Sequence, residues 1–142
     1  MKSLKPSIFQ LVDKPRVTKN IFQLNKEFNF PGELSLEIDN NIKVIKMFEE
    51  DKNAIVVLNL TFFKGRIFEE IPFKLEIEIE GLFSWGDELE NKSDRLEFLL
   101  NENAPAILYS YLRPMITTIT LDANLPPLVI PLMNFREQNQ TK

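Results

Sequence analysis

Three glutamates on one predicted strand are the residues whose type and spacing could do chemistry. From Lys74 to Glu80, apolar and acidic residues alternate, which places them on opposite faces of a strand. The acidic face holds Glu76, Glu78 and Glu80, and the apolar face holds Leu75, Ile77 and Ile79. Paired carboxylates can act as general acid and base. A row of them can also dock a basic partner, or form a solvated face that prevents edge aggregation.

The rest of a catalytic apparatus is missing from the sequence. The chain has no cysteine and no histidine, which excludes disulfides, thiolate nucleophiles, imidazole bases and the usual zinc ligands. Gly81 and Gly86 have the spacing of a phosphate loop, but Asp87 and Glu88 follow them instead of a lysine and a hydroxyl residue. We therefore expect a protein that is not an enzyme and that binds no metal and no cofactor.

Composition predicts one folded domain over residues 1–142. Apolar residues make up 44% and charged residues 27% of the chain, close to ordinary globular proteins. The net charge of −4 argues against binding to nucleic acid, which depends on clustered Lys and Arg. No apolar run is long enough to span a membrane, and Met1 to Lys5 lead into mixed sequence where a signal peptide would have an apolar stretch. We expect a cytoplasmic protein without membrane insertion.

The first two thirds of the chain predict an antiparallel sheet, and the spacing of the runs suggests a meander. Turns are expected at Asn40-Asn41, from Glu50 to Asn53 and from Lys64 to Arg66. Pro15 cannot donate to a ladder, so the N-terminal strands are expected at an edge. Besides Lys74 to Glu80, the predicted strands are Ile8 to Val12, Arg16 to Leu24, Glu33 to Asp39, Ile42 to Phe48 and Ala54 to Phe63.

After Trp85 the apolar period changes to that of a helix. Asp94 and Glu97 have the spacing of a capping box for a short helix that ends near Asn101. Pro105 then opens a longer helix, and Pro114 predicts a kink near Ser110. One broad face of this helix carries Leu108, Leu112, Met115, Ile116 and Ile119.

An apolar, proline-containing connector follows the helix, and Asn124 can adopt the left-handed conformation that ends it. Prolines at 126, 127 and 131 exclude a regular helix from Leu125 to Pro131. Such a connector can present apolar side chains without burying them all, and an exposed apolar patch marks a binding site. The residues expected to contact a binding partner are Leu125, Leu128, Ile130, Met133 and Phe135. Phe83 and Trp85 belong either to the core or to the same surface.

The block from Asn103 to Phe135 resembles the signature region of the SecB export chaperones. A proline precedes Ile-Leu-aromatic, then come Tyr-x-Arg, Ile-Thr and a proline-containing connector that ends in Asn-Phe. The residues concerned are Pro105, Ile107, Leu108, Tyr109, Tyr111, Arg113, Ile116, Thr117, Pro126, Leu128, Pro131, Asn134 and Phe135. The run through Glu76, Gly81 and Phe83 is similar to the family's last strand.

The resemblance implies an α+β fold, with a four-stranded antiparallel sheet and a long helix from the C-terminal half packed on one face. It also implies a homotetramer, a dimer of dimers in which the long helices meet through Tyr111, Met115, Ile116 and Ile119. Unfolded polypeptides would bind in apolar grooves, less covered here because only seven residues follow Phe135, where the family usually adds a second helix.

The family also docks its translocation motor, SecA, on acidic residues of the sheet's outer face. Glu76 matches one of those positions, and Glu78 and Glu80 extend the acidic row. The other usual acidic positions align with Asn20 and Leu24, which leaves delivery to SecA open. The alternatives are a chaperone dedicated to an unstable partner such as an antitoxin, a structural adaptor with an acidic face, and an α+β domain that binds an apolar small molecule.

Overall fold

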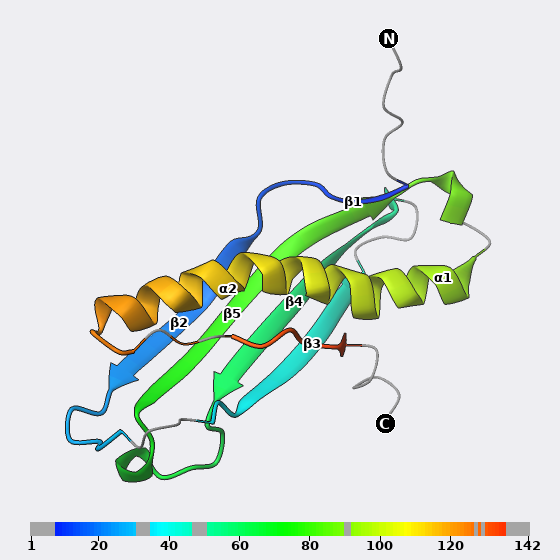
Figure 1. Ribbon diagram of the computed structural model, residues 1–142. Helices are drawn as coiled ribbons and strands as arrows, with labels where there is room; N and C mark the ends of the chain where they lie inside the picture. Colours follow the sequence, from blue (N-terminus) through cyan, green and yellow to red (C-terminus); the bar gives the residue numbers. More distant parts are fainter. Residues whose placement is uncertain are drawn as a thin grey trace.

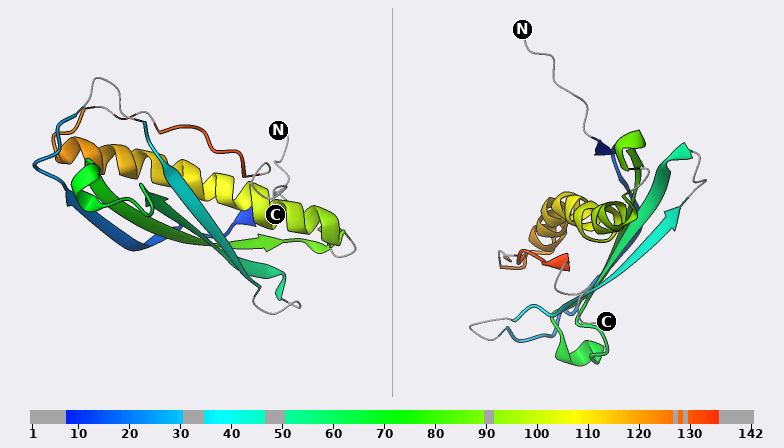
Figure 2. Two further views of the ribbon diagram at one scale, coloured as in Figure 1. Left: turned by 90° about the horizontal axis from the view of Figure 1, so that it is seen from below. Right: turned by 90° about the vertical axis from the view of Figure 1, so that its right-hand side faces the viewer.

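An antiparallel sheet with one long helix across its face forms the fold (Figure 1). The computed structural model describes residues 8–30, 35–46, 51–89, 92–126, 128 and 130–135. The helix lies on one side of the sheet, and the opposite side is free of helices in the described part of the chain (Figure 2). This arrangement confirms the predicted α+β class.

The five strands of the sheet occupy four positions, because the two N-terminal strands share one edge. Strands β3, β4 and β5 form an antiparallel meander. Strands β1 and β2 both pair with the far edge of β5, β1 at its C-terminal end and β2 along its N-terminal part. The bounds are β1 Phe9–Leu11, β2 Arg16–Leu24, β3 Ile38–Lys46, β4 Asn53–Phe62 and β5 Phe73–Trp85.

Two predictions about the sheet are wrong. The meander does not include β2, which pairs with β5 instead of β3. The expected turn at Asn40-Asn41 lies inside β3, where the two residues pair with Leu60 and Asn59 of β4. Continuous pairing with a neighbouring strand overrides a local turn preference. Of the predicted strand and turn residues, those at 33–34, 47–48 and 50 lie outside the described residues.

The predicted alternation in β5 is confirmed and extends beyond Glu80 to Trp85. The inner side chains of β4 and β5 face the helix and form the centre of the core, and Leu58, Leu60 and Ile77 are fully buried. The glutamates of β5 lie on the outer face. Strand β5 is hydrogen-bonded along both edges, because it lies between β4 and the two N-terminal strands.

The helix is one continuous run with a wide turn inside it. Helix α1 (Ser93–Phe98) continues through a π-helical turn (Leu99–Asn103) into α2 (Ala104–Asp122). Pro105 lies in the first turn of α2, as predicted, although α2 continues the preceding helix without a break. The wide turn lies just before this proline, where the missing N–H and the bulk of the ring would disturb an ordinary α-helical turn. The capping box is also wrong, because α1 begins at Ser93 without a side-chain cap.

Helix α2 buries one face on the sheet and ends as predicted. Its residues Leu108, Leu112 and Ile116 are fully buried, and the helix continues through Pro114. Asn124 is left-handed with φ 60°. Around it, the Asn124 N–H bonds the Leu121 carbonyl at 2.9 Å and the Leu125 N–H bonds the Thr120 carbonyl at 3.1 Å. This pair of bonds is the Schellman motif, which reverses the chain.

After this reversal the chain returns beside α2 as an extended segment, which we name the strap (the described residues from 125 to 135). Both views place it on the same side of the sheet as the helix (Figures 1 and 2). Asn40 of β3 lies beneath it and donates to the sulfur of Met133 at 3.2 Å. A sheet four strands wide spans roughly 15–20 Å, whereas a helix covers about 10 Å. The strap therefore covers inner sheet surface that α2 cannot reach.

Gly81 sets how closely α2 approaches the sheet. A Cβ at this position would lie 2.9 Å from Leu11 Cδ1 and 3.0 Å from Leu108 Cδ2. We predict that Gly81→Ala lowers the free energy of unfolding by about 1–3 kcal/mol through overpacking. In urea unfolding, Gly81→Ala combined with Leu108→Ala should cost less than the sum of the single changes, because shortening Leu108 makes room. Full additivity would contradict close packing at this point.

Candidate functional site

Two side chains of α2 hold the strap by its backbone. The Tyr109 hydroxyl donates to the Pro131 carbonyl, and Arg113 Nη2 donates to the Ile130 carbonyl at 2.9 Å. The ring of Phe135 meets Tyr109 edge-on, with centroids 6.1 Å apart. Burial raises the pKa of Tyr109, against the opposing effect of the Arg113 charge. The phenol therefore stays protonated at neutral pH and remains a donor.

The strap is less exposed than the sequence predicts. Leu125, Ile130 and Phe135 are buried, so the prediction that they present apolar surface is wrong for this conformation. Phe83 is buried as well and stacks on Phe9, with ring centroids 5.4 Å apart. The physical reason is the width of the sheet: buried strap side chains fill space beside α2. Trp85, Leu128 and Met133 are only half-buried.

An apolar hollow of about 290 Å³ lies between the helix and the end of the strap. We name it the strap hollow. Phe98 at the end of α1 is 48% exposed, and Leu132, next to Met133 in the strap, is 84% exposed. Neither was among the predicted contact residues, since α1 was assigned only a structural role and Leu132 has no periodic pattern around it. The residues that line the strap hollow are Phe98, Glu102, Asn103, Ala106, Met133, Asn134 and Phe135.

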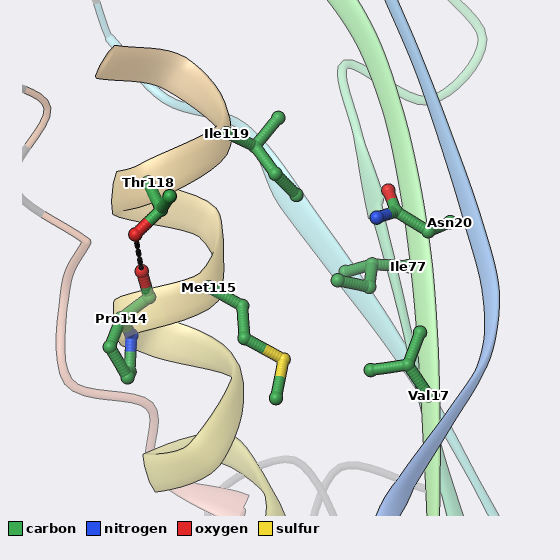
Figure 3. Close-up of a pocket in the computed structure, with 7 residues that line it drawn as sticks. All are labelled: Val17, Asn20, Ile77, Pro114, Met115, Thr118 and Ile119. Carbon is green, nitrogen blue, oxygen red and sulfur yellow. Dashed lines mark hydrogen bonds between the residues drawn. The ribbon is translucent and has the colours of Figure 1, made fainter. Parts of the chain in front are cut away.

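A second hollow, of about 400 Å³, lies on the other flank of α2, toward strand β2 (Figure 3). We name it the edge hollow. Met115 and Ile119 extend from the helix toward Val17, Asn20 and Ile77 of the sheet, and Pro114 and Thr118 complete the lining. Most of this surface is hydrocarbon. The edge hollow therefore suits contact with another apolar surface.

The residues predicted for helix contacts between subunits divide into two groups. Met115 and Ile119 line the edge hollow, and Tyr111 is half-buried against the core. Ile116 is fully buried under α2, so in this conformation it packs within the subunit. A contact between Ile116 and a second subunit would need another conformation and stays a prediction.

The three glutamates of β5 lie in a row on the outer face, and strand β2 supplies their partners. Arg16 Nε lies 2.6 Å from Glu80 Oε1, and Lys19 Nζ lies 3.1 Å from Glu76 Oε2. Thr18 donates to Glu78 at 2.7 Å. The row is thus paired within the subunit.

Glu76 is also bonded from the opposite side of β5. Asn59 Nδ2 donates to Glu76 Oε2 at 3.0 Å. This bond, followed by the one from Lys19, lowers the pKa of Glu76. A general acid near neutral pH needs a raised pKa, so the geometry does not favour acid catalysis here.

The two positions of β2 aligned with acidic docking residues face the other way. Asn20 lines the edge hollow, and Leu24 pairs in register with Phe73, whose side chain is buried on the inner face. Neither lies beside the glutamate row. Within the described ranges, no cluster of acidic residues has the arrangement of a metal site, and no helix is long and apolar enough to cross a membrane.

The outer-face network predicts a pH response. Asn59→Ala should raise the pKa of Glu76 toward its ordinary value, because the largest cause of the lowering is lost. The stability that ionised Glu76 contributes is present above its unfolded-state pKa and is lost as pH falls through its folded-state pKa. In the variant this loss should occur at higher pH.

Carboxyl-carbon NMR titration of the folded protein measures the pKa of Glu76 directly. Asn41→Ala is a matched control, because it removes the same kind of side chain from the neighbouring strand, in register with Asn59. An unchanged pKa of Glu76 in Asn59→Ala would show that the amide does not stabilise the carboxylate.

The sequence is similar to that of known proteins. The family described as preprotein translocase subunit SecB matches residues 6–142. An uncharacterized protein of Methanocaldococcus jannaschii is 32% identical over 101 residues, which cover 71% of this chain and 62% of that protein. The protein-export protein SecB of Anaplasma phagocytophilum is 33% identical over 70 residues, 49% of this chain and 44% of that protein. The matches thus span less than two thirds of these relatives.

A solved structure has the same fold. It is the SecB-like chaperone of Mycobacterium tuberculosis in complex with a peptide from the HigA1 antitoxin. The TM-score is 0.71, and the match covers 88% of this chain and 90% of that one at 16% sequence identity. Together with the family match over nearly the whole sequence, this shared fold confirms the resemblance found in the sequence. The chain belongs to the SecB family.

Proposed function

We propose that this protein is a non-enzymatic cytoplasmic holdase that binds extended apolar segments of unfolded polypeptides at the strap hollow. The observation that carries the proposal is the apolar surface of that hollow, where Phe98 is exposed to solvent and Met133 is half-buried. Exposed apolar surface of this kind marks interaction sites. Burial of this apolar surface against a client is favourable and does not depend on the orientation of the contacting groups. Selectivity between clients is therefore loose.

The chemistry around the strap hollow defines the preferred client. Met133 can adjust its shape to different side chains, and Phe98 offers an aromatic face. Glu102 lines the same hollow, and its charge favours segments that carry Lys or Arg near their apolar residues. Extended, aromatic-rich and positively charged segments fit this description.

The same proposal includes a homotetramer, with Tyr111, Met115 and Ile119 of α2 near the contacts. The edge hollow offers an apolar surface next to β2, and two apolar residues of that edge strand, Val17 and Ile21, are exposed. An unpaired strand edge is a ready site for association. Several strap hollows on one assembly would raise avidity by about 10² to 10⁴ once a client is tethered.

A narrower function is favoured by one comparison. The M. tuberculosis chaperone with this fold was solved with an antitoxin peptide, so a chaperone dedicated to one unstable partner is the second candidate. Delivery to SecA would use the outer face around Glu76, Glu78 and Glu80. Their pairing with β2 must then be exchanged for pairing with a basic partner. Binding of an apolar small molecule in the edge hollow is the remaining alternative.

The proposed client surface can be tested by removing an exposed apolar group of the strap hollow, Phe98, and one of the neighbouring strap, Leu132. Phe98→Ser and Leu132→Ser should each weaken the suppression of aggregation of a chemically denatured protein several-fold, because less apolar surface remains for the client. Light scattering of the aggregating client measures the effect. Ile67→Ser is the matched control, since Ile67 is 60% exposed and lies in the loop between β4 and β5. Equal suppression by all three variants would contradict the proposed site.

The assembly can be tested independently. Light scattering coupled to size exclusion should give a mass near four subunits of 16.6 kDa each. Met115→Glu places a charge in the edge hollow and should shift the protein to smaller species, whereas Ile67→Glu should not. A monomeric wild-type protein would exclude the tetramer.

A further inference from the structure

The strap lies like a bound extended peptide on the surface beneath it. We name this surface the seat; it includes Asn40 of β3 and Tyr109 and Arg113 of α2. Tyr109 and Arg113 bond two successive strap carbonyls, those of Pro131 and Ile130. Three strap side chains spaced five residues apart, Leu125, Ile130 and Phe135, are buried. Backbone carbonyls are common to every polypeptide. The seat therefore recognises an extended chain with an aliphatic residue at one position and an aromatic residue five positions later.

The strap hollow opens beside the end of this seat. Met133 and Phe135 line the hollow, and Phe135 is also the residue whose ring meets Tyr109. A client that occupies the strap hollow therefore already touches the last residues of the strap. At its other end the strap is fixed by the reversal at Asn124, where the left-handed residue and the helix-ending bonds hold the chain. A strap displaced by a client would therefore stay attached at Asn124.

We infer that the seat beneath the strap is a second client-binding site, in which an extended segment with an aliphatic residue and an aromatic residue five positions later replaces the strap. This inference rests on the proposed function. The client makes the same kinds of contact as the strap that it replaces. It supplies carbonyls to Tyr109 and Arg113 and apolar side chains to the positions of Ile130 and Phe135. A large part of the strap's lost interactions is regained in the exchange, so the site can be buried and still available.

A reversible link between strap and sheet tests this directly. The chain has no cysteine, and the side chains of Asn40 and Met133 meet at 3.2 Å. In the Asn40→Cys, Met133→Cys variant, a short bis-methanethiosulfonate linker would join the strap to β3, and reductant would release it. The probe is a fluorescent peptide with the sequence of residues 124–135. The linked protein should bind this peptide at least about tenfold more weakly than the reduced protein, a difference of about 1.4 kcal/mol.

Two controls separate the effect of linking the strap to β3 from other effects of the variant. The double variant treated with methyl methanethiosulfonate carries the same two modified cysteines without a link between strap and β3, and its affinity for the peptide is the reference for the linked protein. A peptide with serine at the positions of Ile130 and Phe135 should bind weakly to the reduced protein. Equal affinity of linked and reduced protein for the native peptide, or no binding by either, would overturn the inference.

A parallel assay keeps the proposed function distinct. Suppression of aggregation of a denatured client is measured with linked and reduced protein. Stronger suppression by the reduced protein supports the second site. Equal suppression by both overturns the second site and leaves the holdase function standing, whereas no suppression by wild-type protein overturns the proposed function itself.

Discussion

The inner face of the sheet is wider than one helix can cover, and most features of this protein follow from that mismatch. Helix α2 buries Leu108, Leu112 and Ile116 along its central line, which leaves inner sheet surface on both of its flanks. On the β3 side the chain covers that surface with its own strap. On the β2 side the edge hollow remains. A small domain thus folds while two apolar hollows persist at its surface, where an ordinary core would be closed.

This geometry gives the strap two roles that act against each other. Its buried residues complete the core, while its half-buried and exposed residues, Met133 and Leu132, form the surface proposed for clients. The strap is held to α2 by Tyr109 and Arg113 through backbone carbonyls, bonds that any extended chain could make. The polar outer face behaves differently, because Arg16, Thr18 and Lys19 of β2 already satisfy its carboxylates.

The sequence predicted what depends on local pattern and missed what depends on tertiary geometry. The alternation in β5, the edge position of β2 and the left-handed stop at Asn124 are confirmed because each follows from a few neighbouring residues. The pairing of β2 with β5 was missed because the alternation of apolar residues identifies a strand but not its neighbours in the sheet. Burial of Ile130 and Phe135 depends on the width of a sheet that no local pattern reports. Leu132 and Phe98 were missed because the patterns around them do not distinguish exposed from buried positions.

Hydrogen–deuterium exchange with and without an unfolded client tests the central claim most directly, because it locates the binding surface on the whole chain at once. Binding at the strap hollow predicts slower exchange in segment 98–106 when the client is present, with unchanged exchange in the outer-face segment 76–80. Exchange in segment 130–135 should slow where the client covers the strap and rise where the client replaces it. Client-dependent protection confined to the outer face, with no change around the strap, would contradict the account.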